Sequence, residues 1–219
     1  MLTWFCDHSF RYIWKPHYLA STPGRILSII DLIQNSTYRK ENPTIEKLYQ
    51  DQTQYFTQAQ EYGLCNRLDN KTGGLLYFAR NPCIYDLYHQ AQSTNLVTKT
   101  YLADIVGKYR HHSSIIATAL ISHHPQDSRK MIWWWYDPCT TNHSLIQPMY
   151  HDPHINRTTL QIQIKRGKRH QIRIHLASLG YIIVWEDLYI SPKFKKHQEM
   201  WSFYHLRCVG LQITIPWTS

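Results

Sequence analysis

Residues 63–81 read GLCNRLDNKTGGLLYFARN, and this stretch joins a polar loop to an apolar run. The loop carries Arg67 and Asp69, and the run at residues 75–79 (LLYFA) is typical of a buried strand. An aspartate in a turn is most often an exposed carboxylate. The stretch therefore predicts a loop followed by a core strand, and by itself it leaves the role of Asp69 open.

The chain before this stretch predicts one strand and two helices. Residues 11–14 (RYIW) indicate a strand, which the dipeptide Lys15-Pro16 ends. Residues 25–35 carry apolar side chains at helical spacing, at Ile26, Ile29, Ile30 and Ile33. A second helix is predicted within the polar residues 36–60, from the positions of Ile45, Leu48 and Tyr49.

The chain after it mixes helices and strands. Asn81 and Pro82 are typical of a helix start, and the expected apolar face comprises Ile84, Leu87, Tyr88 and Ala91. A second helix is predicted at residues 170–179, with Gly180 as its C-terminal stop. Strands are predicted at residues 100–106, 159–165 and 206–215, with further strands and loops within 109–157. Because the elements do not alternate as regular βαβ units, we expect an α+β fold.

The charge balance narrows the class of partner. The 24 Lys and Arg residues outnumber 15 Asp and Glu residues, which gives a formal net charge of +9. Such a balance favours a polyanion, with nucleic acid first and an acidic membrane surface second. The five cysteines lie far apart and form no C-x-x-C pair, so a disulfide framework or a cysteine zinc site is not expected. With no signal peptide and no run of ~20 apolar residues, we expect a cytoplasmic protein.

The segment at residues 164–180 (IKRGKRHQIRIHLASLG) concentrates positive charge between a strand and a helix. A solvated basic loop is the ordinary interpretation of such a run. Arg173, however, lies between Ile172 and Ile174 in an apolar helix. A buried arginine needs a partner, because an unpaired buried charge is costly. Asp69 would be a suitable partner.

Three segments in this order resemble the RluA-type pseudouridine synthases. The family pattern H-R-L-D-x-x-T-S-G-L-L corresponds to Asn66-Arg67-Leu68-Asp69 through Leu76. The pattern K-x-Y corresponds to Lys99-Thr100-Tyr101, which continues to Gly107. The pattern G-R-x-H-Q-I-R-x-H-L corresponds to Gly167-Lys168-Arg169-His170-Gln171-Ile172-Arg173-Ile174-His175-Leu176. Weaker similarities lie at Lys15-Pro16, Leu188-Tyr189 and Leu206 to Leu211.

The resemblance implies a pseudouridine synthase fold, with a mixed, mainly antiparallel sheet flanked by helices and loops and a basic catalytic cleft. We expect a single catalytic domain over residues 1–219, without the N-terminal module of the S4 type that many members carry. The implied reaction converts specific uridines in ribosomal or transfer RNA to pseudouridine. Because that isomerisation is internal and redox-neutral, we expect the enzyme to require neither a cofactor nor a metal. We also expect a monomer that binds RNA.

The resemblance also assigns roles to individual residues. Asp69 matches the catalytic aspartate, Tyr101 the tyrosine that stacks on the target uracil, and Arg173 the arginine that pairs with the aspartate. Arg67 matches the arginine that fills the space left by the flipped base, a role that suits a flat cation. Leu68 and Ile172 are expected to pack near the site. Expected RNA contacts are Lys99, Lys165, Lys168, Arg169, His170 and Gln171.

Several positions depart from the family patterns. Asn66 replaces a histidine, Gly73 a serine, Trp185-Glu186 a Gly-Asp pair, Ile182 a proline and Arg207 a histidine. These departures motivate a second hypothesis, a non-catalytic RNA-binding protein that keeps the fold. A membrane-surface protein is a weaker alternative, because no basic amphipathic helix is visible.

Two further features have plain structural interpretations. The histidine pairs at 111–112 and 123–124 and the run at 151–154 lack the H-E-x-x-H spacing of a metal site, so solvated loop histidines are expected. The three tryptophans at 133–135 could stack on bases, but such a run favours a core or interface position.

Overall fold

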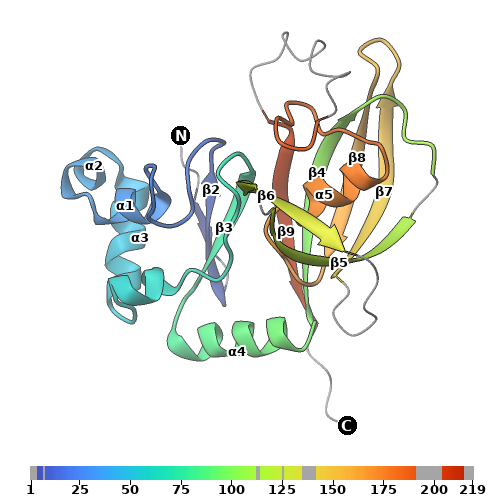
Figure 1. The fold of residues 1–219 in the computed structure, drawn as a ribbon. Coiled ribbons are helices and arrows are strands. Elements are labelled where there is room, and N and C mark those ends of the chain that lie inside the picture. Colours follow the sequence, from blue (N-terminus) through green and yellow to red (C-terminus); the bar gives the residue numbers. More distant parts are fainter. Residues whose placement is uncertain are drawn as a thin grey trace. The chain divides into compact units, whose positions relative to one another are not determined.

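The computed structural model of the protein describes residues 4–6, 8–111, 114–124, 126–134, 142–190 and 204–214. The internal contacts of the chain divide it into two compact units (Figure 1). Unit 1 comprises Met1–Leu96 and Ile213–Ser219, and unit 2 comprises Val97–Gln212. Each unit is described by itself, and the single domain expected over residues 1–219 stays a prediction.

Unit 1 is built on a small antiparallel sheet. Its strands are β1 (Trp4–Cys6), β2 (Phe10–Lys15) and β3 (Gly73–Ala79), in the order β1-β2-β3. Ile13 pairs with Leu76 between β2 and β3, and both side chains are fully buried. The strands predicted at residues 11–14 and 75–79 are therefore confirmed.

Four α-helices and a 3₁₀ segment complete unit 1. They are α1 (Ile29–Gln34), α2 (Ser36–Glu41), α3 (Pro43–Thr53), η1 (Gln58–Gly63) and α4 (Pro82–Ser93). The start of α4 is as predicted, because the Asn81 side chain accepts a hydrogen bond from the Ile84 backbone at 3.0 Å. Its apolar face is only partly confirmed, since Tyr88 is buried and Leu87 is 44% exposed.

The helix predicted over residues 25–35 begins later than expected, at Ile29. Ser28 forms a reciprocal capping box with Asp31, in which each side chain accepts a hydrogen bond from the other residue's backbone N–H. This cap satisfies backbone donors that otherwise lack partners at a helix start, and so it fixes the first turn. Ile26 precedes the helix and is 45% exposed, so its place in the apolar face was wrongly predicted.

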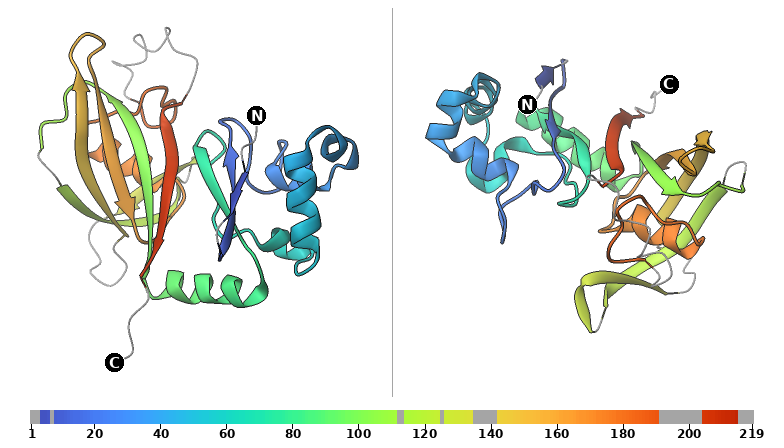
Figure 2. Two further views of the ribbon diagram at one scale, coloured as in Figure 1. Left: turned by 180° about the vertical axis from the view of Figure 1, so that it is seen from behind. Right: turned by 90° about the horizontal axis from the view of Figure 1, so that it is seen from above.

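Unit 2 is a curved sheet with a helix on one face (Figure 2). Its strands follow the order β9-β4-β8-β7-β5-β6. The paired strands β4–β8, β7–β8, β5–β7 and β5–β6 are all antiparallel. Helix α5 (Gln171–Ser178) packs against β5, β6 and β7. The strand bounds are β4 (Val97–Val106), β5 (Ser114–His124), β6 (Asp127–Trp134), β7 (Asn142–Asp152), β8 (Arg157–Ile164) and β9 (Leu206–Ile213).

The core of unit 2 follows from strict alternation along its two central strands. Buried and half-buried residues alternate along β4 and β8, and Ala103 pairs with Leu160 across the buried face. Helix α5 ends as predicted, before Gly180 in the left-handed conformation (φ +80°). The strands predicted at 100–106 and 159–165 and the α+β class are thus confirmed, and the strand predicted at 206–215 is confirmed up to Ile213, with residue 215 outside the described residues. The side chains of the tryptophan run at 133–135 lie outside the described residues.

Within the described ranges, no helix combines the length and apolar character that crossing a bilayer requires.

Candidate active site

The loop that carries Asp69, here called the aspartate loop (residues 66–72), is anchored to β3 by the first of its residues. Asn66 is buried, and its Nδ2 atom donates to the Leu75 carbonyl oxygen at 3.1 Å. Its Oδ1 atom accepts a hydrogen bond from the Tyr77 backbone N–H at 2.8 Å. Asn66, which departs from the family histidine, therefore serves as a side-chain clamp between the loop and the strand.

The middle of the aspartate loop is fixed by a buried serine. The Ser21 hydroxyl accepts a hydrogen bond from the Leu68 N–H at 2.9 Å and donates to the Leu68 carbonyl oxygen at 3.0 Å. The Thr72 N–H then donates to the Asp69 carbonyl oxygen at 3.0 Å and closes a turn. Leu68 is 7% exposed, which agrees with its predicted packing role. These contacts hold the half-buried Asp69 from both sides.

Lys15 places a buried cation beside Asp69. Its ammonium group donates to the carbonyl oxygens of Pro16 and Asn70, each at 3.1 Å, and to that of Leu19. Burial lowers the pKa of Lys15 to about 8, and the negative charge of Asp69 opposes that shift. Sequence reasoning gave Lys15 no place in the site. The available signal was its position at the end of an alternating strand, on the same face as Ile13.

Gly73, another departure from the family pattern, makes room for a histidine. A Cβ atom at Gly73 would lie 2.9 Å from the His17 ring, closer than real Cβ contacts allow. The His17 Nδ1 atom lies 2.7 Å from the Lys71 carbonyl oxygen and so holds the end of the aspartate loop. His17 therefore occupies the space that a serine side chain at position 73 would need.

Arg67 projects from the aspartate loop and meets an acidic partner. Its Nη2 and Nε atoms donate to the two Glu61 carboxylate oxygens at 2.7 and 3.3 Å. The Arg67 side chain is 67% exposed, whereas that of Glu61 is 24% exposed. The anchored member of this pair is therefore the carboxylate, and the arginine lies over it from the solvent side.

Strand β4 carries two of the predicted site residues on its buried face. Lys99 and Tyr101 point to the same side of the sheet and pair with Ile164 and Ile162 of β8. Burial raises the pKa of the nearby Cys208 thiol to about 11, against the charge of Lys99 and a hydrogen bond from Tyr101. Tyr101 therefore lies on a buried face of the sheet, close to the neutral Cys208 thiol and on the same side as Lys99.

Arg173 is buried in a complete hydrogen-bond network. Its Nε atom donates to the Glu186 Oε2 atom at 2.7 Å, and its Nη2 atom donates to Glu186 Oε1 and, at 3.5 Å, to Asp187. Glu186 also accepts hydrogen bonds from the Leu188 N–H and the Tyr204 hydroxyl, both at 2.9 Å. The need for a buried partner was predicted, but sequence reasoning did not identify Glu186. Asp69 belongs to unit 1, so its ion pair with Arg173 stays a prediction.

Trp185 and Glu186 stand where the family pattern has a Gly-Asp pair. Trp185 adopts the left-handed conformation, with φ of +72°, which costs a residue with a side chain ~1–2 kcal/mol. Its buried indole N–H finds no acceptor among the described residues. The glycine of the pattern matches this backbone geometry, and the acid of the pattern matches the partner of Arg173. Glu186 keeps the carboxylate of that pair.

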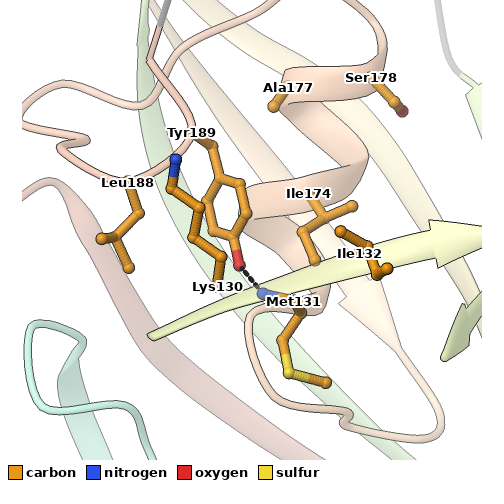
Figure 3. A pocket seen from close by; sticks show the side chains of 8 residues that line it. All are labelled: Lys130, Met131, Ile132, Ile174, Ala177, Ser178, Leu188 and Tyr189. Atoms are coloured by element: carbon orange, nitrogen blue, oxygen red, sulfur yellow. Dashed lines mark hydrogen bonds between the residues drawn. The ribbon is translucent and has the colours of Figure 1, made fainter. Parts of the chain in front are cut away.

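Tyr189 joins the Arg173 network to strand β6. Its hydroxyl accepts a hydrogen bond from the Met131 N–H at 2.8 Å, and the His170 Nδ1 atom lies 2.8 Å from the same oxygen. The centre of its ring lies 5.2 Å from the Arg173 guanidinium carbon. Figure 3 shows the Tyr189 hydroxyl reaching the β6 backbone beside a pocket of about 410 Å³. Ile132, Ile174 and Leu188 give this pocket apolar walls.

The basic loop between β8 and α5 has an exposed part and a buried part. Lys165, Arg166, Lys168 and Arg169 are exposed. His170 and Gln171 are 7% and 2% exposed, and the Gln171 Oε1 atom accepts the Lys168 N–H at 3.0 Å. Both side chains make hydrogen bonds within the protein. Their predicted contacts with RNA stay predictions. Ile172 is 5% exposed, as its packing role requires.

Among the residues that the structure describes, no group of three His, Cys, Asp or Glu side chains could hold a metal ion.

Comparison with known proteins gives a consistent result. The family model described as RNA pseudouridylate synthase matches residues 10–178. The "Dual-specificity RNA pseudouridine synthase RluA" of Vibrio vulnificus is 25% identical over 209 residues, which cover 92% of this chain and 76% of the relative. The "Ribosomal large subunit pseudouridine synthase C" of Haemophilus influenzae is 27% identical over 135 residues, 61% of this chain and 40% of the relative.

A solved structure shares the fold. The structure titled "Human RNA Pseudouridylate Synthase Domain Containing 1" superposes with a TM-score of 0.70 and 19% sequence identity, over 97% of this chain and 78% of that one. The family match and the relatives agree with one another. The chain belongs to the RNA pseudouridylate synthase family, a family of RNA-modifying isomerases, and is of its RluA type.

Proposed function

We propose that the chain converts a uridine in ribosomal or transfer RNA to pseudouridine, with Asp69 as the nucleophile. The observation that carries the proposal is the placement of Asp69 on a loop clamped by Asn66 and Ser21, with the Lys15 cation beside it. One relative is named a ribosomal large subunit synthase, which supports ribosomal RNA as the substrate, and another is named a dual-specificity RNA synthase, which is compatible with a second RNA class. A monomeric state and action in the cytoplasm are part of the same proposal.

The first requirement of the reaction is access to a stacked base. The target uridine must leave the stack, which costs a few kcal/mol. Arg67, exposed at the rim of the aspartate loop, fills the vacated space with its flat guanidinium group. The extruded uracil stacks on Tyr101, an interaction worth ~1–3 kcal/mol per base. The apolar partners of Tyr101 on β8 favour that contact over hydration.

The second requirement is exchange of one bond for another. Asp69 assists cleavage of the bond between C1′ and N1, the uracil turns, and C5 bonds to C1′. The C5 proton leaves to a base, for which Tyr101 is the candidate, and N1 gains a proton. All atoms of the uridine are retained, so no oxidant or co-reactant is needed.

Two cations keep Asp69 suited to this role. A nearby positive charge favours the ionised form of a carboxylate, and Lys15 supplies such a charge within unit 1. Arg173 would supply the second and would aim the carboxylate. The rigid hold of Glu186 on Arg173 would then set the direction of that contact, since a bidentate pair fixes the plane of the guanidinium group.

The test uses RNA from a strain that lacks this gene. Purified protein is added, and pseudouridine is mapped by carbodiimide labelling and primer extension. We expect the wild type to add a mark at a specific uridine and Asp69→Asn to add none. Asp86→Asn, which alters an exposed carboxylate on α4, is the matched control and should retain the mark. Isomerisation that survives Asp69→Asn would show the assignment to be wrong.

The alternative, an RNA-binding protein without catalysis, rested on the departures from the family patterns. The local structure gives three of the departures physical compensation: Asn66 clamps the loop, His17 fills the space at Gly73, and Glu186 retains the buried carboxylate. These compensations support the catalytic proposal over the alternative. Tight RNA binding by the wild type without any pseudouridine would reverse that preference.

A further inference from the structure

We propose that Glu61 and the cavity beside Arg67 form a subsite that selects a guanine next to the target uridine. This inference rests on the proposed function, because it concerns the RNA on which the aspartate loop acts. It assigns sequence selection to Glu61 in unit 1, and it gives Arg67 a second role beside the one proposed in base flipping.

The cavity is large enough for a nucleotide and lies at the aspartate loop. Its volume is about 780 Å³, within the ~300–1,000 Å³ of ordinary ligand sites. Ile30 is 1% exposed and gives it an apolar floor, on which a base can lie. Polar side chains surround this floor, namely Thr22, Thr57, Gln58, Glu61 and Arg67.

The position of Glu61 in this cavity is fixed by the backbone. Glu61, Tyr62 and Gly63 are three consecutive residues in the left-handed conformation, with φ of 49°, 54° and 78°. A Cβ atom at Gly63 would lie 2.7 Å from the Phe56 ring, so the backbone packs directly on that ring. The Gln52 side-chain amide donates a hydrogen bond to the Tyr62 carbonyl oxygen. The strained turn is thus held from two sides and presents Glu61 to the cavity.

A carboxylate at this place does not serve phosphate binding. The chain carries a net charge of +9, and a protein that binds the RNA backbone does so with cations. A negative side chain at the edge of the aspartate loop repels phosphate. It can, however, accept hydrogen bonds from the N–H groups of a base, as acidic residues do in nucleic-acid recognition. Glu61 is therefore suited to reading a base edge.

The pattern of donors selects guanine. Only guanine presents two adjacent donors, N1–H and N2–H, on its Watson–Crick edge, and both oxygens of a carboxylate can accept them together. Adenine, cytosine and uracil each place a ring or carbonyl acceptor next to their donor, which would face a carboxylate oxygen unfavourably. In the free protein the two Glu61 oxygens bind Arg67 at 2.7 and 3.3 Å. Guanine would replace Arg67 on Glu61 and release the arginine toward the RNA.

The nucleotide bound at Glu61 is a neighbour of the target uridine. Arg67 and Asp69 are two residues apart in one clamped loop, and such a separation spans at most ~7 Å. The base on Glu61 and the uridine on Asp69 are therefore close in the RNA chain.

The experiment uses a pool of short RNAs that all contain the target uridine. That uridine is first identified by the mapping experiment of the proposed function, and the nucleotides on either side of it are randomised. Sequencing of the pseudouridine-containing products gives the base preference at each position. For the wild type we expect guanine to be enriched at one flanking position. For Glu61→Gln we expect that preference to fall about tenfold, in line with the discrimination of one bidentate base contact. Glu46→Gln is the matched control, because Glu46 also binds an arginine, Arg39, at 2.9 Å; it should keep the preference.

The other outcomes are distinguishable. A wild type without base preference, or a preference that Glu61→Gln leaves unchanged, overturns the subsite. An equal change of rate for all flanking bases also overturns it and leaves Glu61 as a holder of Arg67 alone. RNAs from the same pool are also captured on immobilised protein. Sequencing of the captured RNAs measures the preference for guanine in binding, without catalysis. Guanine-selective capture by the wild type without any pseudouridine would support the subsite while refuting the proposed function.

Discussion

Lys15 in unit 1 and Arg173 in unit 2 are both buried cations, and the protein stabilises them in different ways. In unit 1, Lys15 is fully buried and donates to the backbone carbonyl oxygens of Pro16, Leu19 and Asn70. In unit 2, Arg173 is 4% exposed and pairs with the carboxylate of Glu186. Partial charges surround the first cation, and a full opposite charge neutralises the second.

The difference follows from the chemistry of the two side chains. A lysine in a weakly compensated site can lose its proton, and burial lowers the pKa of Lys15 to about 8. An arginine keeps its charge in proteins, so its burial requires a carboxylate. The charge of Lys15 is thus adjustable by pH, whereas the charge of Arg173 is permanent.

Removal of the carboxylate should give the largest effect. Glu186→Ala leaves Arg173 as an unpaired buried charge, and we expect a loss of about 3–5 kcal/mol in the free energy of unfolding. Urea titration measures this loss. Asp187→Asn is the control, because the Asp187 side chain is 50% exposed and lies 3.5 Å from Arg173. Equal small losses in both variants would mean that Arg173 does not depend on Glu186.

A third buried basic group sharpens the comparison, because burial favours its neutral form. His175 is fully buried, and its Nδ1 atom lies 2.7 Å from the Ser144 hydroxyl. Burial, with His143 adding to it, lowers the pKa of His175 to about 4. The unfolded histidine takes up a proton below about 6.5, so stability is full above that pH and falls as the pH drops toward 4.

We expect His175 to account for about 2 kcal/mol of the stability lost between pH 7 and pH 4.5, from a shift of this size. The measurement is the free energy of unfolding at both pH values for the wild type and for His175→Asn. The variant should show the smaller loss. Parallel pH profiles would mean that His175 titrates alike in the folded and unfolded states.

The adjustable cation of unit 1 predicts a change at alkaline pH. The folded pKa of Lys15, about 8, is below its ordinary 10.5, so the unfolded state binds more protons between these values. Stability should therefore rise with pH there, as the cost of burying the charge disappears. Between pH 7.5 and 9.5, the wild type should gain about 2 kcal/mol relative to Lys15→Met. A constant difference between the two proteins across this range would contradict the shift.

The smallest expected change in stability concerns the uncharged contact between Gly73 and His17, next to the aspartate loop. Gly73→Ser places a side chain 2.9 Å from the His17 ring, and such overpacking costs about 1 kcal/mol or more. His17→Ala should remove the conflict, so the double variant should lose less stability than the sum of the two single variants. Thermal unfolding of the four proteins measures this coupling. Simple additivity would show that the two side chains do not compete for space.

Local patterns predicted most of the elements. Strand-like composition located the strand at residues 100–106, alternation located the strand at 159–165, and the Asn81-Pro82 signal located the start of α4. The start of α1 was missed because the spacing of isoleucines continues beyond the helix, whereas the capping box at Ser28 sets its limit. A short-range hydrogen bond thus outweighed the apolar period.

Sequence motifs located the loops of the candidate site, but not the long-range contacts that hold them. The aspartate loop and the basic loop were both located from their motifs. The clamp by Ser21 joins residues 47 positions apart, and the Lys15 contact with Asn70 spans 55 positions. No periodicity encodes such distances. The partner of Arg173 lies 13 positions away, and only its burial in an apolar helix indicated that a partner exists.

The contact between Gly73 and His17 also restricts the order in which the sequence can evolve. A lineage that regained serine at position 73 while histidine remained at 17 would pass through an overpacked intermediate. If position 17 first acquires a smaller side chain, the Lys71 carbonyl oxygen loses its contact, but the path to serine opens. Coupling between Gly73→Ser and His17→Ala would make the two sites epistatic, and the accessible route would then change position 17 before position 73.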